Sequence, residues 1–217
     1  MKLKEFDLDL PRLDRESRKN FRWQTRCVAA LYSRCFPGLD VSGAWKVLVA
    51  CVDRVDVSGV QDQLGVFTQE VEFDYPAFLG AAPLHRKELA TEVLHKGALR
   101  VAQAQGWSSS PFEAAYRQVV ELHYVNEWTW PKPRSSPNRK RRAFLSCLHE
   151  AEYFRAWLVV VDKDGTDIER VLAIDEPPNE FIFVPKMGEV KWTSDEHVVL
   201  LDKSGSEVAG LTIERPT

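Results

Sequence analysis

The feature that most limits the fold is a change of sequence pattern near residue 143. Between residues 143 and 213 the chain contains only strand-length apolar or alternating segments, each ended by turn residues. Strands are therefore expected at residues 143–149, 153–162, 167–174, 180–184, 189–193, 197–202 and 206–213. Their short connections favour an antiparallel β-meander, which closes into a small sandwich or forms a covering sheet.

The part of the chain before residue 128 mixes strand and helix signals. The expected elements are strands at 6–10, 44–52 and 64–75, a helix between Asp14 and Pro37-Gly38, and helices at 85–105 and 111–124. The strands at 44–52 and 64–75 are expected to pair as a hairpin. The order β-α-β-β-α-α predicts an α+β layer, so the fold class of the whole chain is α+β.

The two patterns meet in the segment "WTWPKPRSSPNRKRR", residues 128–142. Its prolines favour extended backbone and exclude a regular helix. We therefore divide the chain into an α+β subdomain at 1–127, a stiff Pro/Arg-rich crossing at 128–142 and an all-β subdomain at 143–217. Arg and Trp are enriched at interface hot spots. The predicted partner-binding residues are Trp128, Trp130, Lys132, Arg134, Arg139, Lys140, Arg141 and Arg142.

Two stretches, "LVVVDKDGTDI" and "VVLLDKSGSEV", are similar, and "DKDGTD" in the first resembles a calcium loop at first sight, although the second has Ser204 in place of Asp164. An EF-hand would need oxygen ligands at Val160 and Val171, counting from Gly165, and both are apolar. Asp and Gly supply turn conformations instead, so each stretch is expected to be a hairpin. No zinc spacing is present, and the sequence predicts neither a metal nor a cofactor.

Catalytic motifs are also missing: the chain contains no phosphate-binding loop and no GxSxG elbow. Cys147 and His149 are the one close thiol–imidazole pair, and on a strand they would lie on one face about 7 Å apart. That separation is too long for a hydrogen bond, so a nucleophilic role would need bending and further groups. An enzyme with a pocket around Cys147, His149 and Glu150 stays open as an alternative.

The charge balance restricts the choice of partner. A net charge of −3 and a pI near 6.0 give the molecule no overall attraction to nucleic acid or anionic membrane. Nucleic-acid binding would therefore have to be local to residues 128–142, where two tryptophans are followed by six cations. No apolar run approaches the roughly 20 residues that span a bilayer. The four scattered cysteines are typical of reduced, buried thiols, which predicts a cytoplasmic protein.

One composite pattern covers residues 85–165. A helix ending in "GW" is followed by "PFEAAY", by "NEWTWPKPRSSPNRK" and by a long hairpin. The pattern resembles bacterial stand-alone proteins of the immunity or toxin-accessory kind. The resemblance implies a small cytoplasmic α+β protein that neutralises a toxin by forming a tight complex, with no catalytic residues. Three hypotheses follow: a protein-binding immunity-type protein, a nucleic-acid-binding accessory protein, and an enzyme.

Overall fold

The computed structural model describes residues 2–213. The chain forms two compact units, the first ending at Asn126 and the second starting at Glu127. Helices and strands are mixed in the first unit, and antiparallel sheets dominate the second. The predicted α+β class with a C-terminal antiparallel sheet is confirmed.

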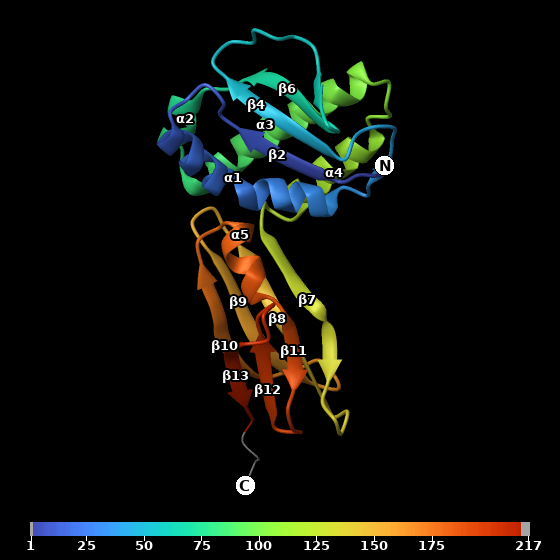
Figure 1. Ribbon diagram of the computed structural model, residues 1–217, viewed down its shortest axis with the longest axis vertical. Coiled ribbons are helices and arrows are strands. Elements are labelled where there is room, and N and C mark those ends of the chain that lie inside the picture. Colours follow the sequence, from blue (N-terminus) through green and yellow to red (C-terminus); the bar gives the residue numbers. More distant parts are fainter. Residues whose placement is uncertain (1, 214–217) are drawn as a thin grey trace. The chain divides into compact units, whose positions relative to one another are not determined.

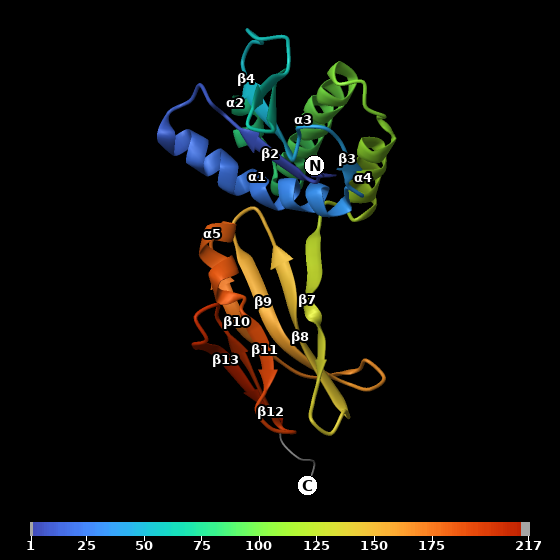
Figure 2. The same ribbon diagram turned by 45° about the vertical axis from the view of Figure 1, so that its right-hand side comes forward.

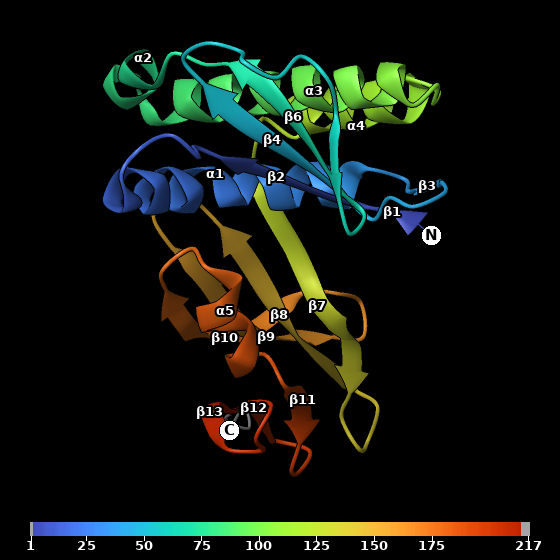
Figure 3. The same ribbon diagram turned by 45° about the horizontal axis from the view of Figure 1, so that its top comes forward.

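The N-terminal unit is built on a four-stranded sheet with the order β2-β4-β6-β5. Its elements are β1 (Lys2–Leu3), β2 (Glu5–Asp9), α1 (Arg15–Cys35), β3 (Leu39–Asp40), β4 (Lys46–Val52), β5 (Gln61–Gln63), β6 (Val66–Glu72), α2 (Tyr75–Gly80), α3 (Pro83–Ala104) and α4 (Ser110–Glu121). Strand β4 is parallel to both β2 and β6, and β5 is antiparallel to β6. Helices α1 and α3 lie on the same side of this sheet (Figures 1 and 3).

Helix α1 follows the sequence signals closely. The side chain of Asp14 accepts hydrogen bonds from the backbone N–H groups of Glu16 and Ser17, at 2.9 and 3.0 Å. The helix ends at Cys35, two residues before Pro37. The amide-capping carboxylate and the helix-breaking proline therefore set its two ends, as predicted.

The core of the N-terminal unit depends on a close approach between α3 and β4. Val49 of β4 and Leu8 of β2 are fully buried. Gly97 of α3 lies against Val49, and a Cβ atom at Gly97 would be only 2.4 Å from Val49 Cγ2. The absence of a side chain at this position therefore sets the distance between helix and sheet.

The expected hairpin between residues 44–52 and 64–75 is wrong. Strands β4 and β6 are parallel neighbours, with Val47 opposite Phe67 and Cys51 opposite Val71. The hairpin partner of β6 is β5, and the turn between them contains Leu64 and Gly65, both with positive φ. The chain reverses twice between β4 and β6, so the two strands run in the same direction.

Two short helices differ from the expected elements. The expected strand at 64–75 ends earlier, at Glu72. Residues 75–80, for most of which no element was expected, form α2, because the Asp74 side chain accepts the N–H of Ala77 and caps a helix. The expected strand at 180–184 is wrong, since α5 (Glu180–Phe183) occupies it. The side chain of Asn179 accepts the N–H of Phe181 and starts this short helix.

The C-terminal unit contains two antiparallel sheets. Its elements are β7 (Asn126–Ser135), β8 (Arg141–His149), β9 (Phe154–Asp162), β10 (Asp167–Glu176), α5, the 3₁₀ helix η1 (Val184–Lys186), β11 (Glu189–Trp192), β12 (His197–Leu201) and β13 (Glu207–Thr212). One sheet has the order β10-β9-β8-β7 and the other β11-β12-β13 (Figure 2). Leu145 and Leu158 of the first sheet belong to one buried cluster with Val198 and Leu200 of the second. The two sheets therefore enclose a shared apolar core.

The twin stretches are hairpin turns. Gly165 and Gly205 have φ of 96° and 88°, which favours glycine. The side chains of Asp162 and Asp202 each accept two backbone N–H groups of their own turn. The pKa of Asp162 is lowered chiefly by the backbone N–H of Thr166, and the pKa of Asp202 chiefly by the hydroxyl of Ser204, which donates to it, and then by the backbone N–H of Ser206. The aspartates therefore stabilise turns, and the prediction made for them is confirmed.

Candidate partner-binding surface

The predicted crossing is part of a sheet. Residues 128–135 lie in β7, and the chain then turns and enters β8 at Arg141. Strand β7 is the edge strand beside β8, so the prolines lie where missing N–H donors cost least. The segment is extended, as the prolines indicated, and it is also the first hairpin of the C-terminal unit.

The two tryptophans of this hairpin face inward. Trp128 and Trp130 are half-buried and pack against the core cluster of the C-terminal unit. The ring of Trp128 lies 5.9 Å from that of Phe154, measured between centroids. These side chains fasten β7 to the core, which leaves little of either ring for an outside partner.

The six predicted cations divide into two groups. Lys132, Arg134, Arg139 and Lys140 are exposed, whereas Arg141 and Arg142 are half-buried. The Nη2 of Arg142 donates to the carbonyl of Lys163 at 3.2 Å, and its buried Nε has no hydrogen-bond partner among residues 2–213. The four exposed cations form no ion pair with any residue between 2 and 213. Lys132 and Arg134 lie on β7, and Arg139 and Lys140 lie in the turn between β7 and β8. We call these four side chains, together with that turn, the basic tip.

The basic tip is held in place by the end of β11 and by the loop between β11 and β12. The side chain of Asp195 accepts the N–H of Asn138 at 2.8 Å, and its carbonyl accepts Nη1 of Arg141 at 3.1 Å. The indole N–H of Trp192 donates to the carbonyl of Arg134 at 2.9 Å. Three bonds from outside the hairpin therefore fix the tip before any partner arrives.

The turn of the basic tip is strained and presents a charge. Arg139 has φ of 58°, a conformation that a long side chain rarely adopts. Its N–H donates to the carbonyl of Ser136 at 2.9 Å, and Ser136 is itself buried. Backbone strain of this kind persists only where surrounding contacts impose it, and it concentrates at functional positions.

A groove of about 330 Å³ lies beside the basic tip. Its lining includes Arg134 and Pro137 from the hairpin and Glu189, Lys191 and Trp192 from β11. The lining contains two cations and one anion, so it extends the positive surface of the tip. The groove lies within the C-terminal unit and joins segments that are far apart in the sequence.

The suspected enzyme pocket is part of the core. Cys147 and His149 lie on the inward face of β8 and are 0 % and 1 % exposed. The ring of His149 packs edge-on against Phe154 and Phe183. A substrate could not reach this thiol or imidazole without opening the core. Within residues 2–213, no group of three or more His, Cys, Asp or Glu side chains is placed to hold a metal ion.

Comparisons with family models, with curated proteins and with solved structures found no match. The functional argument therefore depends on the residues of this chain. No helix in the described part of the chain is long and apolar enough to cross a membrane.

A buried polar network in the N-terminal unit carried no sequence signal. The hydroxyl of Tyr32 in α1 lies 3.0 Å from Nδ1 of His95 in α3, and it donates to the carbonyl of Phe112 at 3.2 Å. Nε2 of His95 lies 3.4 Å from a carboxylate oxygen of Glu113. Burial lowers the pKa of His95, against the opposing effect of Glu113, and raises the pKa of Tyr32. The network connects α1, α3 and α4.

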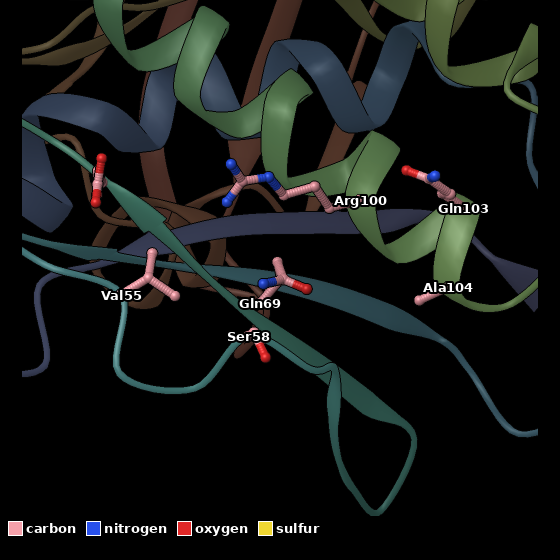
Figure 4. A pocket seen from close by; sticks show the side chains of 7 residues that line it. Val55, Ser58, Gln69, Arg100, Gln103 and Ala104 are labelled. Carbon is pink, nitrogen blue, oxygen red and sulfur yellow. The ribbon is translucent and has the colours of Figure 1, made fainter.

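A second cavity, of about 620 Å³, also escaped the sequence argument. It lies in the N-terminal unit between β6, the end of α3 and the loop that follows β4 (Figure 4). Gln69 and Glu72 line it from β6, Arg100 and Gln103 from α3, and Ser58 from the loop. We call it the edge pocket. Its polar groups come from three separate segments, so no local motif announces it.

Proposed function

We propose that this chain is a non-catalytic protein-binding protein whose basic tip docks on an acidic surface of a partner protein. The observation that carries the proposal is the set of four exposed cations that form no ion pair within residues 2–213, on the end of β7 and the turn after it, which Asp195 and Trp192 hold in place. A fixed tip loses little conformational freedom on binding. Positive charge on it also accelerates encounter with an acidic partner.

The resemblance of residues 85–165 to immunity and toxin-accessory proteins narrows the proposal. On this view the partner is a toxin, and the chain neutralises it by forming a tight stoichiometric complex. Bacterial origin and a cytoplasmic location are parts of the same proposal. The four cysteines of the chain are buried and form no disulfide within residues 2–213, which suits a reducing compartment.

Single-stranded nucleic acid is the alternative ligand for the same cations. Such binding combines phosphate contacts with stacking of bases on exposed aromatic rings. Here the rings of Trp128, Trp130 and Trp192 all pack against the core of the C-terminal unit, and the indole N–H of Trp192 also donates to the carbonyl of Arg134. The cations are available to phosphates, but these rings are not free platforms for bases. The arrangement therefore favours a protein partner.

The test is an affinity capture from the native host, followed by mass spectrometry. The wild-type chain is compared with a variant in which Lys132, Arg134, Arg139 and Lys140 are all changed to Gln. A matched control changes four exposed cations of the N-terminal unit to Gln: Arg15, Lys19, Lys96 and Arg117. Both variants lose the same charge, so a general electrostatic effect would weaken both equally.

We expect one stoichiometric protein that the wild type and the control capture and the basic-tip variant loses. Equal capture by all three chains would refute the role of the basic tip. Loss of the captured material after nuclease treatment, with affinity that falls steeply as salt rises, would identify nucleic acid as the ligand.

A further inference from the structure

The edge pocket exists because one strand of the sheet is too short. Strand β5 pairs with β6 only at residues 66–68, so within the part of the chain that the structure describes, residues 69–72 of β6 have no strand beside them on that side. Two side chains donate to the backbone carbonyl of Glu70 in place of a neighbouring strand: Nε2 of Gln69 at 3.0 Å and Nη1 of Arg100 at 3.3 Å. The space that a longer β5 would fill remains as a pocket.

The pocket carries one cation and one anion that do not neutralise each other. Arg100 forms no ion pair with any described residue, and its contact to the carbonyl of Glu70 leaves its other N–H groups available. Glu72 is exposed and likewise forms no ion pair between residues 2 and 213. Figure 4 shows Arg100 reaching from α3 over the β6 strand that carries Gln69. The guanidinium suits a carboxylate, because it can donate two parallel hydrogen bonds to it.

The floor of the pocket supplies an unused acceptor. Gln69 is only 3 % exposed, and its amide nitrogen is committed to the Glu70 carbonyl. No group in the described part of the chain donates to its Oε1. Together with the carboxylate of Glu72, this oxygen suits a ligand that carries N–H donors. Val55 adds an apolar contact to the lining.

We propose that the edge pocket binds a small zwitterion of the α-amino-acid type. The ligand carboxylate accepts from Arg100, and its ammonium group donates to Glu72 and to Oε1 of Gln69. Glu72 repels a polyanion such as phosphate, and Arg100 repels a simple amine, so each charge acts against one class of wrong ligand. A volume of about 620 Å³ accommodates an amino acid with its side chain. This site is independent of the basic tip.

The experiment uses the full-length chain and isothermal titration or ¹H–¹⁵N NMR. The twenty standard L-amino acids are titrated individually up to 10 mM, with inorganic phosphate alongside. For the amino acid that binds most tightly, the des-amino acid and the α-amide are then titrated as matched probes of one charge each. The variants are Arg100→Gln and Glu72→Gln, and the control is Lys96→Gln, which removes an exposed cation one turn earlier in α3.

We expect at least one amino acid to bind, and both matched probes to bind at least ten times more weakly. Arg100→Gln and Glu72→Gln should each weaken the amino acid at least ten-fold, while Lys96→Gln leaves it unchanged. If Glu72 binds the ammonium group, Glu72→Gln should also reduce the difference in affinity between the amino acid and its des-amino analogue, which lacks that group. If Glu72 has only a structural role, this difference in affinity should stay the same. No binding up to 10 mM, phosphate binding as tight as the amino acid, or unchanged affinity in both variants would overturn the proposal.

Discussion

The replacement Gly97→Ala tests how the helical layer of the N-terminal unit packs on its sheet. The added Cβ would lie 2.4 Å from Cγ2 and 2.8 Å from Cγ1 of Val49, both well inside van der Waals contact. Val49 is fully buried on the central strand β4, and a β-branched side chain has little rotamer freedom. The valine cannot turn away, so α3 must move outward.

Two opposing effects decide the magnitude. Alanine is favoured over glycine inside a helix by about 1 kcal/mol. Forcing an extra methyl group into a packed core costs about 1–3 kcal/mol, and two contacts below 3.0 Å place Gly97→Ala near the upper end. The free energy of unfolding should therefore fall by about 1–2 kcal/mol.

Urea denaturation followed by circular dichroism at 222 nm measures this change, because the long helices α1, α3 and α4 all belong to the N-terminal unit. We expect the midpoint to fall by about 0.5–1 M. Gly80→Ala is the matched control, since a Cβ at Gly80 meets nothing within 4 Å. The double variant with Val49→Ala should be less destabilised than the sum of the single variants. A higher midpoint for Gly97→Ala, or additive single effects, would refute the reasoning.

Three further predictions follow from the hydrogen bonds and the core. The pKa of His95 is lower in the folded chain than its ordinary value of 6.5, so the unfolded chain takes up the proton first as pH falls. The free energy of unfolding should therefore decrease below pH 6.5, and His95→Gln should flatten this dependence in urea titrations at pH 5–8. Asp195→Ala removes the acceptor of the Asn138 N–H, and hydrogen exchange at residues 136–140 should accelerate about ten-fold; an unchanged rate would show that the tip needs no tether. Phe183→Ala removes a buried ring stacked on Phe154 at 3.7 Å and should cost about 3–5 kcal/mol, seen as lost dispersion of methyl NMR signals from the C-terminal unit.

The sequence predicted the elements that depend on interactions between residues close together in the chain. Asp14 and Pro37 delimit α1 through a capping bond and a missing N–H donor, and both effects act within a few residues. The Asp–Gly turns at Gly165 and Gly205 follow from backbone conformation in the same way. The apolar runs in β8 and β9 also lie close to their expected positions.

Pairing partners depend on distant contacts, and there the sequence was insufficient. Strand β5 is "QDQ", with no apolar side chain to mark it, so its role as the hairpin partner of β6 had no signal. An alternating strand such as β6 does not specify which strand lies beside it. The short helix α5 differs from the expected strand because "EFIF" is too short to show a helical period.

In the candidate sites, too, the sequence predicted local features but not the contacts between distant segments. The sequence shows where the cations of residues 128–142 are, but it does not distinguish the exposed Arg139 from the half-buried Arg142. That distinction depends on the strand register of β8 and on the backbone carbonyl of Lys163. The edge pocket requires Arg100 and Glu72 to come together from separate elements, which only the folded chain shows.

The antiparallel sheets of the C-terminal unit and the parallel strands of the N-terminal unit also differ in how fast their strands can pair during folding. In the C-terminal unit β8, β9 and β10 pair with their neighbours along the chain, and so do β11, β12 and β13. In the N-terminal unit, pairing of β2 with β4 closes a long loop of chain, because all of α1 lies between these two strands in the sequence. Contacts between distant segments are slow to form because the intervening chain must first be ordered. When the full chain refolds from denaturant, we therefore expect β-hairpins of the C-terminal unit to be protected before the parallel strands of the N-terminal unit.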